Sequence, residues 1–309
     1  MSRSASSPST GRWAIVGLVL FLLFDALLVG WALSAHRGNG SVVAAPVPVP
    51  AVTTPAPDET PTMAPASTPV RLLSVLDDRT AWRSVLGACQ GTPPSLELTT
   101  DAGRTWQPSD IAGIAGVGRI ASVQATSVDI ASVVAFDARN CAPVLALSYV
   151  AGGDWVTYPD RVTGSWFVDP ATPSLVHTPT GDVQAPCSAM TALASGGGAN
   201  AAVLCADHTV HRTEDTGATW SAPIPVPGSV AIGDSGSGYL VATAGLAECA
   251  GVAVTTVPDA ATAPSGPGVC ATDSAPAAGE VAVDAAGGTA WLWAGDELAT
   301  SADGGATWR

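Results

Sequence analysis

The sequence predicts an all-β domain over residues 70–309, assembled from small repeated sheets and preceded by an apolar segment and a Pro-rich linker. Three observations predict this class. From Val70 onward, short runs rich in Val, Ala, Leu and Thr alternate with Gly, Pro, Asp and Asn, and no segment keeps a helical period. One eight-residue pattern recurs through the same part of the chain. The 309 residues also include 33 Gly and 25 Pro, a composition that suits many turns and few long helices.

The charge balance excludes two classes of partner. The chain carries 12 basic and 26 acidic side chains, giving a formal net charge of −14, and every basic residue is Arg. A nucleic-acid binder needs a basic face to neutralise phosphates, and an electrostatic hold on anionic lipid needs the same. We therefore expect no nucleic-acid partner.

Residues 13–34 are predicted to form a transmembrane helix, because about 20 apolar residues cross a bilayer core. Trp13 and Trp31 suit the two membrane interfaces, and Arg3 and Arg12 precede the run. The excess of positive charge before the run places residues 1–12 in the cytoplasm and the remainder outside. Asp25 inside the run is either a tolerated carboxyl group or a polar contact with a partner helix.

A cleaved signal peptide is the alternative interpretation of this segment. Residues 32–34, Ala-Leu-Ser, could serve as a small-residue cleavage site, although the apolar run exceeds the usual 7–15 residues of a signal core. Both interpretations export the rest of the chain. Residues 35–69 then form a Pro-rich linker, which we expect to be disordered. It should still be extended and semi-rigid, because Pro fixes φ and lacks an amide donor.

The recurring octad follows the pattern Ser/Thr-x-Asp-x-Gly-x-Thr-Trp. Full copies begin at Thr99, Thr213 and Ser301, and a degenerate copy that lacks the Asp begins at Ser148. An Asp at the third position can accept amide hydrogen bonds from the residues that follow it, and Gly supplies the positive φ of a tight turn. The residues expected to build these turns are Asp101, Gly103, Trp106, Gly152, Trp155, Asp215, Gly217, Trp220, Asp303, Gly305 and Trp308.

These octads resemble the Asp-box (BNR) repeat of sialidases, sortilin-type receptors and photosystem-assembly propellers. The resemblance covers residues 70–309 and implies a β-propeller in which each box joins the third and fourth strands of a blade. At the usual repeat length, this part of the chain makes about five to six four-stranded blades. One of them is expected around residues 238–257, with a decayed box. Because the sequence ends just after the last box, we expect residues 70–75 to supply the missing outer strand of the final blade.

Six cysteines lie in the predicted exported part, and their even number indicates disulfides. Fifteen pairings are possible. Cys187 and Cys205 lie at opposite ends of a predicted hairpin and make a sensible pair, and Cys249–Cys270 would close a Pro-rich excursion. Cys89–Cys141 is the pair that remains. A metal site is disfavoured because no Cys-x-x-Cys spacing occurs.

The resemblance implies a sialidase as the candidate enzyme. The catalytic set of that family consists of three Arg, a Tyr–Glu pair and an Asp. The Arg-Ile-Pro sequence that usually carries the first Arg is absent, and the Arg residues that could assemble a triad have no supporting motif. These are Arg71, Arg79, Arg83, Arg104, Arg119, Arg139, Arg161 and Arg212, and the only tyrosines are Tyr149, Tyr158 and Tyr239. We therefore assign no catalytic, cofactor-binding or metal-binding residue and expect no cofactor.

Two further motifs favour structural roles. His208 and His211 are three residues apart, so on a strand they point to opposite faces and cannot easily share a metal ion. Trp291 and Trp293 lie on one strand face, where burial between blades is favoured over a sugar-stacking platform.

The sequence as a whole therefore predicts a membrane-anchored, extracytoplasmic propeller that binds an envelope protein or a glycan, rather than an enzyme. The Pro/Thr linker, the abundant Ala and Arg and the absence of Lys resemble those of actinobacterial cell-envelope proteins. The alternative is an exported glycoside hydrolase, similar to an exo-sialidase, with a diverged active site.

Overall fold

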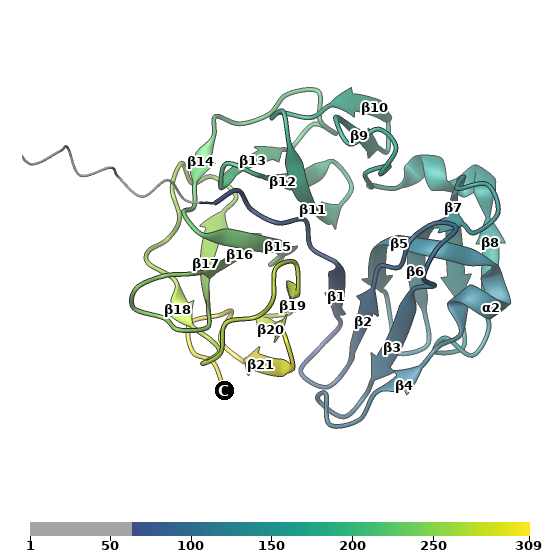
Figure 1. Ribbon diagram of the computed structural model, residues 1–309, viewed down its shortest axis with the longest axis horizontal. Coiled ribbons are helices and arrows are strands. Elements are labelled where there is room, and N and C mark those ends of the chain that lie inside the picture. The colour runs from purple at the N-terminus through teal and green to yellow at the C-terminus, as the bar shows by residue number, and fades with distance from the viewer. Residues whose placement is uncertain (1–63) are drawn as a thin grey trace, which may run out of the picture. The chain divides into compact units, whose positions relative to one another are not determined.

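The computed structural model describes residues 64–309, which form an all-β propeller of five small antiparallel sheets and one two-stranded hairpin. The five sheets lie around a common centre in chain order (Figure 1). The predicted cytoplasmic segment, the transmembrane helix and residues 35–63 of the linker lie outside the described residues. Within residues 64–309, no helix is long and apolar enough to cross a membrane.

Four of the five sheets have four strands, paired in chain order, and the last has three. The first contains β1 (Arg71–Val75), β2 (Ala81–Val85), β3 (Ser95–Thr99) and β4 (Gln107–Pro108); the second β5 (Val117–Ala125), β6 (Ala131–Asp137), β7 (Pro143–Ser148) and β8 (Val156–Tyr158); the third β11 (Met190–Gly197), β12 (Asn200–Cys205), β13 (Thr209–Thr213) and β14 (Ile224–Pro225); the fourth β15 (Ser229–Asp234), β16 (Gly238–Ala244), β17 (Val252–Pro258) and β18 (Val269–Cys270); and the fifth β19 (Val281–Ala286), β20 (Thr289–Ala294) and β21 (Glu297–Ser301). The fourth sheet confirms the blade expected around residues 238–257.

A reduced sheet separates the second and third blades. It contains only β9 (Leu175–Thr178) and β10 (Gly181–Gln184), and an isolated bridge from Phe167 to His177 stands where an inner strand would run. The connection before it contains the short 3-10 helix η1 (Pro159–Gly164), and α2 (Ile111–Ala115) precedes β5. The number of full blades is therefore five, at the lower end of the predicted range.

The prediction about ring closure is wrong. Residues 71–75 form β1, which pairs with β2 as the inner strand of the first sheet rather than as the outer strand of the last. The last sheet has three strands, and Arg309 exchanges two backbone hydrogen bonds of 3.0 Å with Thr300 beside β21. Sequence order alone could not separate these arrangements, because a strand beginning near residue 70 can pair in either direction around the ring.

The first and last sheets instead meet through side chains, at what we call the closure seam. Leu73, Val75 and Ala81 pack against Ala282 and Trp291, all of them buried. At its edge the guanidinium groups of Arg71 and Arg83 lie 4.2 and 4.9 Å from the Trp293 ring centroid. Such cation–π contacts add to the apolar burial that joins the sheets. The two indoles on β20 are thus used between blades, as the sequence favoured.

The Asp-box turns that begin at Thr99, Ser148 and Thr213 connect the third and fourth strands, as the resemblance implied, and the one at Ser301 follows the third strand of the last sheet. In the first, Asp101 accepts hydrogen bonds from the Thr105 amide at 2.9 Å and the Thr105 hydroxyl at 2.6 Å, while the Gly103 amide donates to Thr99 Oγ1 at 3.0 Å. The boxes at Thr213 and Ser301 repeat these bonds. They hold the pKa of Asp101 and Asp303 down to about 2, chiefly through the Thr hydroxyl, so both carboxylates stay ionised in all but strong acid.

Each box is also tied to the first hairpin of its own sheet. The fourth residue of the octad donates its amide to a carbonyl between the first two strands, from Ala102 to Arg79, Ala151 to Asp129, Thr216 to Ala199 and Gly304 to Gly288. The distances are 2.7–3.0 Å, and the degenerate box makes the bond too. We call this end of the ring the box face.

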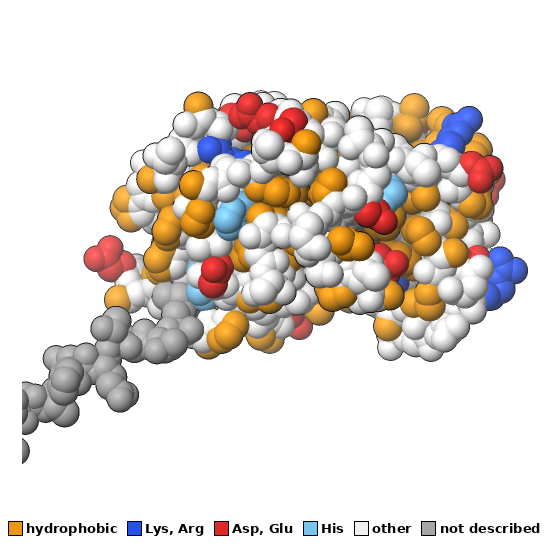
Figure 2. Space-filling view, turned by 90° about the horizontal axis from the view of Figure 1, so that it is seen from above, with side chains coloured by type: hydrophobic (Ala, Val, Ile, Leu, Met, Phe, Trp, Pro, Cys, Tyr) orange, Lys and Arg blue, Asp and Glu red, His pale blue; other side chains and the backbone are white. Residues whose placement is uncertain are grey.

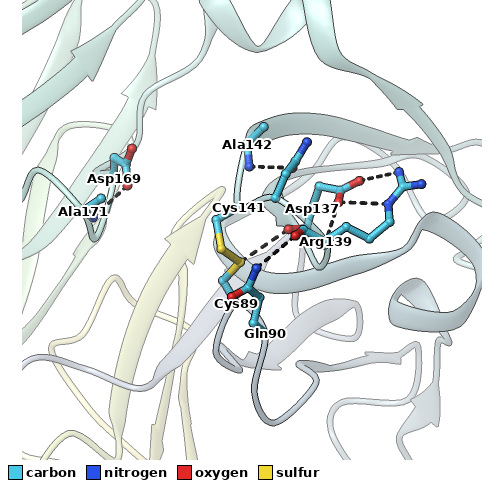
Figure 3. Close-up of a disulfide and its surroundings, with 9 residues drawn as sticks. Cys89, Gln90, Asp137, Arg139, Cys141, Ala142, Asp169 and Ala171 are labelled. Carbon is cyan, nitrogen blue, oxygen red and sulfur yellow. Dashed lines mark hydrogen bonds and ion pairs between the residues drawn. A yellow bond between two sulfur atoms is a disulfide. The ribbon is translucent and has the colours of Figure 1, made fainter.

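All three predicted disulfides are present, and they lie at the opposite end, the disulfide face. Cys89–Cys141 joins the turns after β2 and β6, which occupy matching places in successive sheets (Figure 3). Gln90 Nε2 donates to the Arg139 carbonyl at 2.9 Å beside it. Cys187–Cys205 lies where β12 ends, and Cys249–Cys270 lies close to where β17 begins. Because antiparallel strands alternate in direction, these turns share one end of the ring.

Replacing Gly152 with Ala should destabilise the propeller by about 3 kcal/mol. Gly152 has φ +80°, and an added Cβ would lie 2.6 Å from the buried Trp82 ring and 2.7 Å from Ser109 Oγ. The matched control is Gly304→Ala, at φ +72° with open space around the Cβ, where the other boxes already carry Ala or Thr. Urea unfolding of both variants tests this, and equal losses in the two would contradict the role of packing between sheets.

Candidate functional site

The candidate site is the central channel, a cavity of about 670 Å³ between the inner strands. Its wall is formed by residues of β1, β5, β11, β15 and β19, together with the connection that precedes the reduced sheet. The wall is mixed in character, and Ser74, Gln124, Asp234 and Asp284 are among the polar side chains that line it.

A strap of residues 64–69 runs over the disulfide face to reach this channel. Ala66 donates its amide to Ala206 at 2.9 Å, His208 Nε2 lies 2.8 Å from the Ala64 carbonyl, and Val70 donates to Gly279 at 2.9 Å. Thr68 and Pro69 line the cavity. The chain therefore passes from the third sheet to β1 before the first strand begins, as Figure 1 shows. These six residues were assigned to the linker from sequence.

Two carboxyl groups face the channel from neighbouring inner strands. Asp284 on β19 is partly buried and accepts a hydrogen bond from the Val75 amide of β1 at 2.8 Å. Burial, and secondarily the nearby Asp234 charge, raise the pKa of Asp284 to about 8. Burial also raises the pKa of Asp234, which lies at the end of β15. The Gly236 amide donates a hydrogen bond to Asp234 Oδ2 at 3.2 Å. Asp284 is therefore protonated at neutral pH, when Asp234 is the better candidate for a charge.

Two of the candidate arginines, Arg71 and Arg119, line the channel, and both are engaged. Arg71 lies 3.3 Å from the Glu280 carboxylate, in addition to its stacking on Trp293. Arg119 Nη1 donates to the Gly87 carbonyl at 3.1 Å, and burial lowers its pKa. Neither guanidinium group is presented as a free carboxylate clamp.

The other candidate arginines lie away from the channel lining. Arg83 pairs with Glu97 at 2.6 Å, Arg139 pairs with Asp137 at 2.9 Å and Arg161 stacks on Tyr158 at 4.6 Å. Arg212 binds the carbonyls of Pro258 and Ala261. Arg79 and Arg104 are exposed near the first box. Among the described residues that line the channel there is no Tyr and no Glu.

The two histidines of interest contact separate backbone carbonyls. His208 lies in the turn before β13 rather than on a strand, and its Nδ1 lies 3.1 Å from the Ser229 carbonyl. His211 Nδ1 lies 3.0 Å from the Ser221 carbonyl. Residues 64–309 contain no group of three or more His, Cys, Asp or Glu side chains able to hold a metal ion.

Sequence reasoning missed Asp234 and Asp284. A signal was present, since Asp234 ends the inner strand Ser229–Asp234 and Asp284 interrupts the apolar inner strand Val281–Ala286. A carboxyl group at such a position must face either a neighbouring sheet or the central cavity. Without the ring closure, the sequence could not indicate which.

Comparison with known proteins assigns no family to the chain. No family model matches the sequence, and no curated protein matches it. Among solved structures, YCF48 bound to a D1 peptide is 19% identical, with 80% of this chain and 82% of that chain covered and a TM-score of 0.28. A GH74 xyloglucanase from Xanthomonas campestris is 17% identical over 77% of this chain and 37% of its own, with a TM-score of 0.30.

A Hadza microbial sialidase is 12% identical over 78% of this chain and 57% of that chain, with a TM-score of 0.35. These similar structures thus include both a peptide complex and hydrolases. Every one of these TM-scores is below 0.5, so the similarity concerns the fold and carries no inference about activity.

Proposed function

We propose that the chain is a binding or scaffolding module of the cell envelope, which holds a protein or a glycan and catalyses no reaction. The observation that carries this proposal is the chemistry of the channel wall. Arg71 and Arg119 are engaged with carbonyl or carboxylate groups, and the described lining contains neither Tyr nor Glu. A sialidase-like mechanism needs those groups free and convergent.

The surface also suits an exported binding module. Acidic side chains lie at several places on the side view in Figure 2, and apolar side chains are dispersed among polar ones. An excess of negative charge keeps such a surface soluble and discourages non-specific association with anionic polymers. Three disulfides support an oxidising compartment.

We propose in addition that residues 13–34 anchor the chain in the cell membrane, with residues 1–12 in the cytoplasm and the propeller outside. The support is the apolar run and the preceding arginines. Full-length chain should stay in the membrane pellet after carbonate extraction, whereas a chain lacking residues 1–34 should be released. Release of the full-length chain would contradict the anchor.

A glycoside hydrolase remains the second candidate, and the two channel aspartates favour it. A carboxyl group protonated at neutral pH beside a second carboxyl group is the pairing that glycosidases use as acid and base or nucleophile. The same groups also have a structural use, because Asp284 accepts the Val75 amide and Asp234 accepts the Gly236 amide.

The test is turnover by the full-length chain of fluorogenic sialosides and xyloglucan oligosaccharides, alongside a glycan array. We expect no turnover above that of Asp284→Asn and Arg119→Gln variants, and specific binding of a glycan or an envelope protein. Turnover that is lost in either variant would establish the hydrolase and overturn the binding proposal.

A further inference from the structure

Exposed apolar side chains gather at one place on the propeller. Residues 64–309 contain eight exposed large hydrophobic side chains, and four of them belong to the box-face end of the second sheet. These are Val128, Tyr149, Val150 and Val156, which are 43%, 54%, 56% and 46% exposed. We call this group the second-blade patch.

The patch coincides with the degenerate box. Tyr149 and Val150 are the second and third residues of that octad, and Val128 precedes Asp129, whose carbonyl accepts the Ala151 amide at 2.9 Å. The other boxes carry Thr, Glu or Ala at the second position and Asp at the third. Among the four octads, only that of the second blade therefore has two exposed large apolar side chains at these positions.

The turn does not need those apolar side chains. Gly152 donates to Ser148 Oγ at 2.9 Å, as in the full boxes, and Asp154 accepts the Trp155 amide at 2.9 Å. Tyr149 and Val150 contribute little to the core because more than half of each is exposed. Tyr is among the residues that protein interfaces favour at their centre, and the exposed Val side chains add apolar contact area around it.

The surroundings of the patch indicate the charge of its partner. Asp129 and Asp154 are exposed; Asp129 directly follows Val128, and Asp154 is the seventh residue of the octad that contains Tyr149 and Val150. A second copy of this chain would bring its own negative charge, and anionic lipid would be repelled in the same way.

We propose that the second-blade patch docks a polypeptide segment in which an apolar or aromatic side chain is flanked by Arg or Lys. This inference rests on the proposed binding function and names the surface that performs it. The apolar side chain contacts Tyr149, Val150 and Val128, and the basic residues lie against Asp129 and Asp154. Such electrostatic complementarity fixes register and makes binding sensitive to salt.

The experiment uses the full-length chain and a fluorescent 12-residue peptide library. Each member has a central Leu, Phe or Trp, flanked either by Arg or, in the charge-inverted set, by Glu. We expect binding of Arg-flanked members, measured by fluorescence polarisation, at least tenfold weakening in the Glu-flanked set, and weakening as salt rises.

Two variants remove the patch without removing the turn. Tyr149→Thr gives the second position the residue found in the first box. Val150→Asp combined with Asp154→Thr restores the full octad and should leave thermal stability equal or higher, because the Asp-box hydrogen bonds are regained. Both should weaken peptide binding at least tenfold. Ile114→Thr, which removes an exposed apolar side chain from α2 at the disulfide face, should leave binding unchanged.

Three outcomes would overturn the proposal. They are no binding of any Arg-flanked peptide, peptide binding that survives both patch variants, and sedimentation with phosphatidylcholine vesicles that depends on Tyr149. Peptide or glycan binding that survives the patch variants would leave the proposed function standing and place its surface elsewhere. Glycoside turnover would overturn the proposed function whatever the patch does.

Discussion

Gly233→Ala should unfold the propeller or cost at least about 4 kcal/mol. Gly233 lies on β15, where a Cβ would stand 1.9 Å from the Val283 carbonyl oxygen and 3.0 Å from the Asp284 Cα. Both atoms belong to the backbone of β19, so no side-chain rotation can relieve the overlap. The two inner strands must separate, and the apolar contacts between the fourth and fifth sheets are then lost with the channel wall.

The matched control is Gly164→Ala. Gly164 also lines the channel, but an added Cβ there meets no atom within 4 Å. We expect its free energy of unfolding to lie within about 0.5 kcal/mol of the wild type. Urea unfolding followed by Trp fluorescence compares the two, and a Gly233→Ala variant within 1 kcal/mol of the control would show that the inner strands can move apart freely.

Asp284→Asn should stabilise the propeller at alkaline pH, by about 2–5 kcal/mol at pH 8–9. The pKa of Asp284 is about 8 in the folded chain, against an ordinary value of 3.8, mainly because of burial. The folded state therefore holds a proton that the unfolded state has already released between these values. The free energy of unfolding falls as pH rises from about 4 to about 8, and an amide removes this dependence.

The measurement is the free energy of unfolding from pH 5 to pH 9. The Asp101 and Asp303 carboxylates do not interfere in that range, because their pKa of about 2 confines their effect to acid, where stability falls as they are protonated. Asp234→Asn should lower the midpoint of the Asp284 titration by removing the neighbouring charge. The exposed Asp78 serves as a control through Asp78→Asn, and an equal pH profile for wild type and Asp284→Asn would refute the shift.

The parts of the fold that the sequence predicted correctly depend on local interactions. The Asp, Thr and Gly of each box are bonded within four residues, as in Thr105 to Asp101, so the octad contains its own geometry. Two of the disulfides also close short segments, with Cys187–Cys205 at the ends of a hairpin and Cys249–Cys270 around a Pro-rich excursion, and the third is the pair that remains. The five-blade count within the predicted range, and the blade around residues 238–257, come from the same periodicity.

The parts that sequence could not predict depend on pairs far apart in the chain. The Val75–Asp284 hydrogen bond joins residues 209 positions apart, and it exists only because β1 is an inner strand. If residues 70–75 formed the outer strand of the last sheet, Val75 would not lie beside Asp284 on the inner strand β19. The reduced sheet was also hidden, because Phe167 replaces an inner strand with a single bridge that has no periodic pattern.

The degenerate box illustrates a middle case. In the sequence, Val150 stands where Asp is expected, and this departure alone indicated only a degenerate copy of the box. The exposure of Tyr149 and Val150 is what turns the same departure into a candidate contact surface.

The two ends of the ring are fastened by different chemistry. One rim is held by covalent sulfur bridges, and the other by ionised polar turns that a thiol reagent cannot touch. A reductant therefore loosens a single rim, and strong acid loosens the opposite one. We therefore expect the rim that carries the second-blade patch to keep its hydrogen-bonded turns when the disulfides are reduced.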